Sequence, residues 1–433
     1  MTSLPDATVR ALTRRLAGAQ RQGRLPSLVA AVHRDGDEVF AQRGSDPSTQ
    51  YRIGSISKPF TAVLVMQLRD EGRLRLDDPL DAHLPGTPTG AATIGELLAH
   101  RSGLRREPPG DFWEATPGQA PQALLERLRA EDVAPEAHGV HHYSNLGYGL
   151  LGLVVERLRG LPWVEALDRH VLRPLELRDT TYLPRPPYAT GLRVHPLDDH
   201  VIEEPAHDAR TMAPAGQLWS TPADLCRFGS FLADPCAEVL APATVEEMAR
   251  PAVVVDPAAW TAGYGLGLQL TRRGDRVFAG HGGSMPGFLA NLAVHRSSGV
   301  VAAFCTNAWQ PAAGLLAAEL AERVLADDPE PGPDWSPSDA DPQLADLLGV
   351  WWWRGIQYLA EVRDGRLRLR RAVDVFGEGA TRYRPDGPDR FVGLDGPDLG
   401  EQLVVHRAAT GEVTHLDMAS WLLTRDPDDP RTV

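Results

Sequence analysis

The sequence has little cysteine and no long apolar run, and each shortage excludes a class of protein. Its 433 residues include only three cysteines, which excludes a disulfide framework. None of them stands in the C-x-x-C spacing of a zinc site, so we expect Cys226, Cys236 and Cys305 to be buried as small apolar groups. No stretch approaches the roughly 18 consecutive apolar residues of a membrane span.

Basic residues are also outnumbered. Lysine and arginine total 44 against 58 acidic residues, a net charge of −14. An acidic chain is repelled by phosphate backbones and anionic lipid, so we expect neither nucleic acid nor a membrane as partner. The N-terminal segment places Val9, Leu12 and Leu16 in the spacing of an amphipathic helix, and no apolar leader region follows. We therefore expect a cytoplasmic protein.

A segment rich in proline and acidic residues, 327–342, divides the chain and predicts a stiff linker. It separates a domain at 1–326 from a smaller one at 343–433. We expect Trp351-Trp352-Trp353 to form the first strand and core of the smaller domain, with an aromatic ligand platform as the alternative. Short segments between turn signals predict a small antiparallel β-barrel or sandwich there: 358–362, 366–370, 390–394, 402–406 and 415–419.

The larger domain mixes strands and helices. Residues 28–33 and 39–43 flank Asp35-Gly36 and predict a hairpin, and 288–295 with 300–306 predict a second one. Helix-start signals between them include a capping box at Thr93 and an N-cap at Thr221. This pattern predicts an α+β fold in which one antiparallel sheet joins strands from both ends of the domain.

Three short motifs carry candidate chemistry, and the first contains Ser55 and Lys58. The run from Pro59 to Met66 is apolar, so it is expected to be buried. On a helix, Ser55 and Lys58 share a face. A serine needs a base to become a nucleophile, and burial can lower the pKa of a lysine enough to serve. The alternative is a capping serine and a lysine that extends to solvent.

The second motif is Tyr143-Ser144-Asn145, which precedes an apolar helical run. Tyrosine offers a phenolic proton, and asparagine offers both a donor and an acceptor. The alternative is a loop that caps the next helix.

The third motif is His281-Gly282-Gly283-Ser284, which leads into the second hairpin. Paired glycines in an edge strand let another backbone approach, as a substrate carbonyl would require. His281 could then position a substrate or a proton. The alternative is a glycine-rich turn with a surface histidine.

Together, the order S-x-x-K, Y-x-N and H-x-G resembles the penicillin-recognising serine hydrolases, which comprise β-lactamases, DD-peptidases and related esterases. The Tyr-Ser-Asn motif is similar to the class C β-lactamase and esterase branch. Segments 76–80, 97–104, 214–221 and 264–267 agree with it. The resemblance covers roughly residues 25–325 and implies an antiparallel sheet flanked by helices, an all-helical subdomain, and an active site between them.

The same resemblance implies roles for individual residues. Ser55 would be acylated, Lys58 would be its base, and Tyr143 would relay protons and help to activate water. The backbone N–H groups of Ser55 and Ser284 would form the oxyanion hole. No metal or organic cofactor is expected, and His100 is interpreted as a structural hydrogen-bonding residue. The implied substrate-binding residues are Asn145, His281, Gly282, Gly283 and Ser284.

His281 stands where β-lactamases and DD-peptidases usually carry lysine, and in this it resembles esterases and D-amino-acid peptidases. A histidine is mostly neutral near pH 7, so strong recognition of a free carboxylate is not expected. The leading hypothesis is a serine hydrolase that acts on small-molecule esters or amides, or D-peptides, through an acyl-enzyme. The alternatives are a β-lactamase or D-alanyl-D-alanine carboxypeptidase-like enzyme, a thioesterase or peptide cyclase of penicillin-binding-protein type, and a catalytically inactive sensor.

Two further segments bear on the substrate. Residues 107–135 lie between the first two motifs, so we expect them to line the pocket. The C-terminal domain resembles the lipocalin-like appendage of some family members, which implies either a loop lent to the rim of the active site or a purely stabilising role.

Overall fold

A computed structural model describes residues 4–310, 314–327, 341–375, 377 and 379–432. The chain forms two compact units, Met1–Glu330 and Pro331–Val433. Most of the segment expected to be a linker, 327–342, lies outside the described residues. Within the ranges described, no helix combines the length and apolar composition needed to cross a bilayer.

The first unit is built on an eight-stranded sheet in which both ends of the domain meet. β1 (Leu28–Arg34) pairs antiparallel with β14 (Val300–Thr306), and both expected hairpins are present as β1–β2 and β13–β14. The strand order is β2-β1-β14-β13-β12-β11-β10-β9. The other strands are β2 (Asp37–Arg43), β9 (Val253–Val254), β10 (Ala262–Tyr264), β11 (Gln269–Arg273), β12 (Arg276–Met285) and β13 (Phe288–His295).

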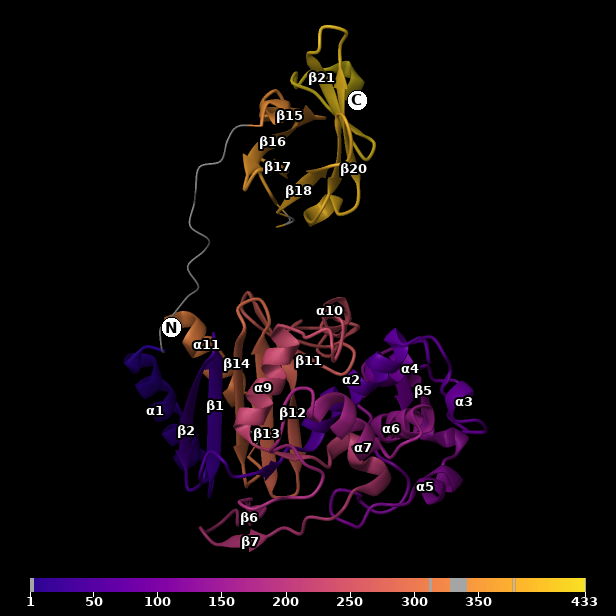
Figure 1. The fold of residues 1–433 in the computed structure, drawn as a ribbon, viewed down its shortest axis with the longest axis vertical. Helices are drawn as coiled ribbons and strands as arrows, with labels where there is room; N and C mark the ends of the chain where they lie inside the picture. Colours follow the sequence, from indigo (N-terminus) through magenta and orange to yellow (C-terminus); the bar gives the residue numbers. More distant parts are fainter. Residues whose placement is uncertain (1–3, 311–313, 328–340, 376, 378, 433) are drawn as a thin grey trace. The chain divides into compact units, whose positions relative to one another are not determined.

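Helices cover both faces of this sheet (Figure 1). Successive side chains of a strand point to opposite faces. Accordingly, Ala30 and Val32 pack in a core with α1 (Asp6–Gly23) and α11 (Leu316–Asp327), whereas Val29 and Ala31 pack in a second core with α9 (Pro222–Ala233). The second core continues into the helical region, so the sheet and the helices between its strands share one apolar interior.

The helical region lies between β2 and β9 in the sequence, and its longest helices, α2 and α6, contact each other and α8. Three two-stranded sheets belong to the same part of the chain, namely β3–β8, β4–β5 and β6–β7. Their strands are β3 (Tyr51–Arg52), β4 (Ser102–Leu104), β5 (Val133–His138), β6 (Leu192–Val194), β7 (Val201–Glu203) and β8 (Trp219–Ser220). The helices are α2 (Ser57–Asp70), α3 (Leu80–His83), α4 (Ile94–Leu98), α5 (Pro121–Arg127), α6 (Asn145–Arg159), α7 (Trp163–Leu167), α8 (Ala213–Gly216) and α10 (Pro242–Met248).

Local sequence signals explain where several helices begin. The capping box expected at Thr93 is present at the start of α4, because the Glu96 amide donates to its hydroxyl and its own amide donates to the Glu96 carboxylate. The Thr221 hydroxyl caps α9 as expected. One local prediction is wrong: Cys226 and Cys305 are buried, but Cys236 is exposed, because it follows Pro235 in the connection between α9 and α10.

The second unit is a nearly closed antiparallel barrel of eight consecutive strands, β15 to β22. Trp352 and Thr424 exchange backbone hydrogen bonds of 2.7 and 2.9 Å, so the first strand meets the chain just after the last one. The tryptophan run forms the first strand as expected, but only Trp351 is buried in the core. The elements are α12 (Pro342–Ala345), β15 (Gly349–Trp353), β16 (Ile356–Arg363), β17 (Arg366–Arg371), β18 (Ala380–Pro385), β19 (Arg390–Gly393), β20 (Gln402–Arg407), β21 (Val413–Met418) and β22 (Trp421–Leu423). Of these, α12, β18 and β22 were not predicted.

Candidate active site

Ser55 and Lys58 meet at the start of α2. Ser55 lies in a short 3₁₀ turn, η1 (Gly54–Ile56), and Lys58 lies in the first turn of the helix. The Nζ atom of Lys58 is 2.9 Å from the Oγ atom of Ser55. Lys58 is fully buried, with groups of Tyr143, Asn145 and Ala215 against its amine, whereas Ser55 is half-buried. The side chains are therefore placed so that the hydroxyl is reachable and the amine is shielded from solvent.

Burial sets the charge state of the lysine. Loss of solvation lowers the pKa of Lys58 from 10.5 to about 7, while the negative charges of Glu114 and Glu107 oppose that shift. The Nζ atom also donates to the Asn145 Oδ1 atom at 2.7 Å and to the Ala215 carbonyl oxygen at 2.8 Å. These acceptors hold the amine in place. Near neutral pH a substantial fraction of Lys58 is uncharged and can accept a proton.

Tyr143 lies beside this pair, on the loop that leads into α6. Its ring centroid is 4.8 Å from the Lys58 Nζ atom. Burial raises the pKa of Tyr143 well above its ordinary value, and a hydrogen bond with Ser55 only partly offsets this effect. The next residue, Ser144, caps α6 by accepting the Gly147 amide at 3.0 Å. The motif therefore both caps the helix and brings a neutral phenol to Ser55.

Asn145 is held by a carboxylate that sequence reasoning did not single out. Its Nδ2 atom lies 3.0 Å from both carboxylate oxygens of Glu107, and Trp113 Nε1 donates to Glu107 at 2.7 Å. Both residues belong to the segment 107–135 that was expected to line the pocket. The position of this segment between the first two motifs was the only sequence feature that indicated a role for Glu107 and Trp113 in the site.

One glycine of the third motif, Gly283, accommodates the chain's own backbone. A Cβ atom at Gly283 would stand 1.9 Å from the Ile53 carbonyl oxygen, and one at Gly54 would stand 2.6 Å from the Ser284 nitrogen. The nucleophile turn thus packs directly against β12. The expectation of an edge strand is wrong for β12 as a whole, since β11 and β13 flank it, although the pairing with β11 ends at Gly280.

His281 is buried and not a surface residue of a turn. Its Nε2 atom lies 2.8 Å from the Tyr264 hydroxyl, and its Nδ1 atom lies 2.5 Å from the Gly282 carbonyl oxygen. Burial, with a smaller effect of the Lys58 charge, lowers the pKa of His281 to about 3. The imidazole is therefore neutral at physiological pH, and its ring centroid is 6.2 Å from that of Tyr143.

His100 supports the second motif. Its Nδ1 atom accepts the Ser144 amide at 3.0 Å, and its ring packs 4.2 Å from the Tyr143 ring. These contacts agree with the interpretation of His100 as a structural hydrogen-bonding residue, because they fix the loop that carries the phenol.

A cavity of about 390 Å³ opens beside the end of β12. Ser284 and Met285 form part of its wall, and Phe112, Glu114 and Trp309 contribute side chains to it. Burial, together with the charge of Glu107, raises the pKa of Glu114 to about 7. The cavity places an aromatic rim and an acidic group next to the expected oxyanion site.

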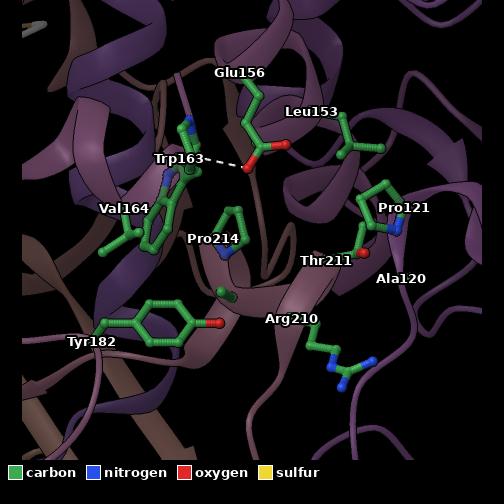
Figure 2. A pocket seen from close by; sticks show the side chains of 13 residues that line it. Ala120, Pro121, Leu153, Glu156, Trp163, Val164, Tyr182, Arg210, Thr211 and Pro214 are labelled. Atoms are coloured by element: carbon green, nitrogen blue, oxygen red, sulfur yellow. Dashed lines mark hydrogen bonds between the residues drawn. The ribbon is translucent and has the colours of Figure 1, made fainter. Parts of the chain in front are cut away.

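A second cavity, of about 380 Å³, lies within the helical region and contains none of the predicted site residues. Figure 2 shows Glu156 and Arg210 on opposite sides of it, with Pro214 between them. Pro214 precedes Ala215, whose carbonyl accepts from Lys58. This cavity therefore lies behind the segment that holds the lysine.

The sheet, the helical region and this serine–lysine pair define a protein of the β-lactamase and penicillin-binding-protein fold. The chain belongs to the β-lactamase family, because the family model described as "Beta-lactamase" matches residues 9–326. Residues 340–425 match a domain of unknown function, DUF7586.

Among characterised relatives, the chain is 33% identical over 319 residues to "Penicillin-binding protein 4" of Amycolatopsis lactamdurans, covering 65% of this chain and 81% of that protein. Several other relatives match over less than half of their own length. A D-stereospecific amidohydrolase from Streptomyces sp. has a similar structure, with 27% identity, a TM-score of 0.63 and coverage of 75% of this chain and 99% of that one. The crystal structure of SurE with D-Leu is also similar, with 26% identity, a TM-score of 0.59 and coverage of 98% of this chain and 100% of that one. The protein is thus a hydrolase of this fold.

Proposed function

We propose that this protein is a serine hydrolase that transfers the acyl group of an ester or a small amide to Ser55 and then to water. The observation that carries this proposal is the 2.9 Å contact between Ser55 and Lys58, a fully buried amine with a pKa of about 7. A neutral amine at hydrogen-bonding distance can take the hydroxyl proton as the oxygen attacks.

The proposed reaction has two halves. In the first, the Ser55 oxygen bonds to the substrate carbonyl carbon, Lys58 takes the proton, and the carbonyl oxygen becomes an oxyanion facing the N–H groups of Ser55 and Ser284. Each such donor is typically worth about 2.7–4 kcal/mol in the transition state. The leaving alcohol or amine departs with a proton relayed through Tyr143. In the second, water attacks the carbon of the Ser55 ester while its proton passes to the same groups, which return a proton to the Ser55 oxygen as it leaves.

The charges around the site limit the range of substrates that can bind. A neutral His281 offers no positive charge to a free carboxylate, so we propose substrates with an amide or ester at that end. Glu114, which lines the cavity beside Ser284, favours a positive charge on the other side of the reacting carbonyl. The amidohydrolase and the D-Leu complex, both similar in structure, support amides or esters of D-amino acids with a free amino group.

Intact-mass analysis with a fluorophosphonate probe tests the mechanism. We expect one label on the wild-type protein and none on Ser55→Ala. Ser57→Ala is the matched control and should be labelled like the wild-type protein. The Ser57 hydroxyl accepts the Leu218 amide at 3.1 Å, so its role is structural. Labelling of Ser55→Ala would refute the assignment of the nucleophile.

Turnover then separates the substrate classes. We expect D-amino acid p-nitroanilides and p-nitrophenyl esters to be hydrolysed faster than nitrocefin or D-Ala-D-Ala, which both carry a free carboxylate. Faster turnover of nitrocefin or release of D-Ala would instead favour the β-lactamase or carboxypeptidase alternative. The similarity to a penicillin-binding protein of Amycolatopsis lactamdurans supports that alternative.

A further inference from the structure

The turn between β6 and β7 gathers three side chains that commonly bind metal ions. His195, Asp198 and His200 each place a ligand atom so that all of these atoms lie within 4.8 Å of one another. The Nδ1 atoms of His200 and His195 lie 2.5 and 3.3 Å from the same Oδ1 atom of Asp198. The two imidazole rings are stacked, with their centroids 4.5 Å apart.

These separations are close to those of a metal centre. Nitrogen and oxygen ligands bind zinc at about 2.0–2.2 Å, so two ligands of one ion lie at most about 4.4 Å apart. Tetrahedral ligands at these bond lengths lie about 3.4 Å apart, so the 3.3 Å contact of His195 with Asp198 already fits, the 2.5 Å contact of His200 with Asp198 must lengthen, and the widest separation must shrink. In this arrangement a metal ion takes the place of the proton between Asp198 and His200, and it displaces the Leu197 amide, which donates to the His195 Nδ1 atom at 3.3 Å.

The backbone of the turn is already fixed in this shape. The Arg24 guanidinium donates to the carbonyl oxygens of His195 and Asp198 at 3.0 and 2.7 Å. The His195 amide donates to the His200 carbonyl oxygen at 3.0 Å, which closes the turn. Arg24 binds mainly carbonyl oxygens here, so it stabilises the turn without occupying an imidazole nitrogen. Its positive charge is balanced by Asp199, 3.4 Å away.

The turn belongs to a hairpin at the rim of the cavity beside β12. Leu192 and Val194 of β6, and Glu204 just after β7, line the same cavity as Ser284. A constraint on the turn therefore acts on the wall of the candidate active site.

We propose that His195, Asp198 and His200 bind one divalent first-row metal ion, of the zinc or nickel class, which clips the β6–β7 hairpin at the rim of this cavity. Two imidazoles and one carboxylate suit such ions, whereas calcium and magnesium prefer oxygen ligands. Water fills the remaining coordination positions. The ion takes no part in the acyl transfer proposed above.

Isothermal titration of Zn²⁺ into the full, untagged Ser55→Ala protein tests this site independently of hydrolase activity. We expect one ion per chain, and at least about tenfold weaker binding for His195→Ala and for His200→Ala, since even partners outside the coordination shell are typically worth 10–100-fold. All three ligands lie at an exposed or half-exposed turn, so these variants should fold.

His138→Ala is the matched control, because its imidazole also pairs with a single carboxylate, that of Glu96 at 2.9 Å. It should bind Zn²⁺ like the parent protein. Electron paramagnetic resonance of the Cu²⁺ form should show two nitrogen ligands, and fewer after His200→Ala. Absence of binding to the parent, or equal binding by His195→Ala and His200→Ala, would overturn the proposal.

Discussion

The amide oxygen of Asn145 accepts a hydrogen bond from Lys58 at 2.7 Å, so the amide nitrogen must face away from the amine. That nitrogen lies 3.0 Å from both carboxylate oxygens of Glu107. A flipped amide would place its NH₂ group against the lysine and its oxygen against the carboxylate. Glu107 thus fixes the orientation in which Asn145 can hold Lys58.

Glu107→Gln should weaken this arrangement. Glutamine keeps one oxygen acceptor, but its NH₂ group would face the N–H donors of Asn145 and Trp113. One of these donors would then lack an acceptor, which typically costs about 1–3 kcal/mol of stabilisation. We expect kcat/KM to fall by about tenfold or more on the best ester or amide substrate. Glu136→Gln, at an exposed position of β5, is the control. An unchanged kcat/KM would show that Glu107 does not position Asn145.

Lys58 can be observed directly because it is the only lysine in the chain, all other side chains among the 44 basic residues being arginine. Labelling with ¹³C,¹⁵N-lysine therefore gives a single side-chain signal in a nuclear magnetic resonance titration. Burial predicts a midpoint near pH 7, as opposed to the ordinary lysine pKa of 10.5. A midpoint close to 10.5 would remove the general base from the proposed mechanism.

The rate of acylation should follow the same ionisation. Only neutral Lys58 can accept a proton, so kcat/KM should rise with pH through about 7 and then level off. The negative charge of Glu114 favours the charged lysine and raises its pKa. Because the pKa of Glu114 is itself raised to about 7, Glu114→Gln removes the part of that charge present near neutral pH and should move the rising limb to lower pH.

The control for this shift is Glu204→Gln, which lines the same cavity but pairs with Arg193 at 2.8 Å. Its pH profile should match that of the parent. A shift to higher pH in Glu114→Gln would contradict the assigned electrostatic effect.

The contact between η1 and β12 predicts a difference between neighbouring glycines. A Cβ atom at Gly283 would meet the Ile53 carbonyl oxygen at 1.9 Å, whereas one at Gly282 would meet nothing closer than 3.6 Å. Gly283→Ala must separate two backbones, so we expect it to lower the free energy of unfolding by about 1–3 kcal/mol or more. Gly282→Ala should change it by less than about 1 kcal/mol. Urea unfolding measures both, and equal losses would contradict the packing.

The sequence predicted features that depend on neighbours along the chain. Asp35-Gly36 between apolar segments gave the first hairpin, and Thr93 with Glu96 gave the start of α4. Ser55 and Lys58 were paired correctly because one helical turn separates them. The paired glycines were expected to admit a substrate carbonyl, whereas in the fold Gly283 admits the chain's own backbone at residues 53–55.

What the sequence determined by itself is the two hairpins, the starts of α4 and α9, most strands of the barrel and the short motifs, including the single lysine, because spacing, capping and apolar periodicity act over a few residues. Only the tertiary structure decided that Glu107 orients Asn145, that His281 is buried and neutral, and that the pKa of Lys58 falls to about 7. These properties depend on how completely distant segments exclude water from a side chain and on which charges they bring near it. Neither the degree of burial nor the nearby charges can be deduced from the residue and its neighbours in the sequence.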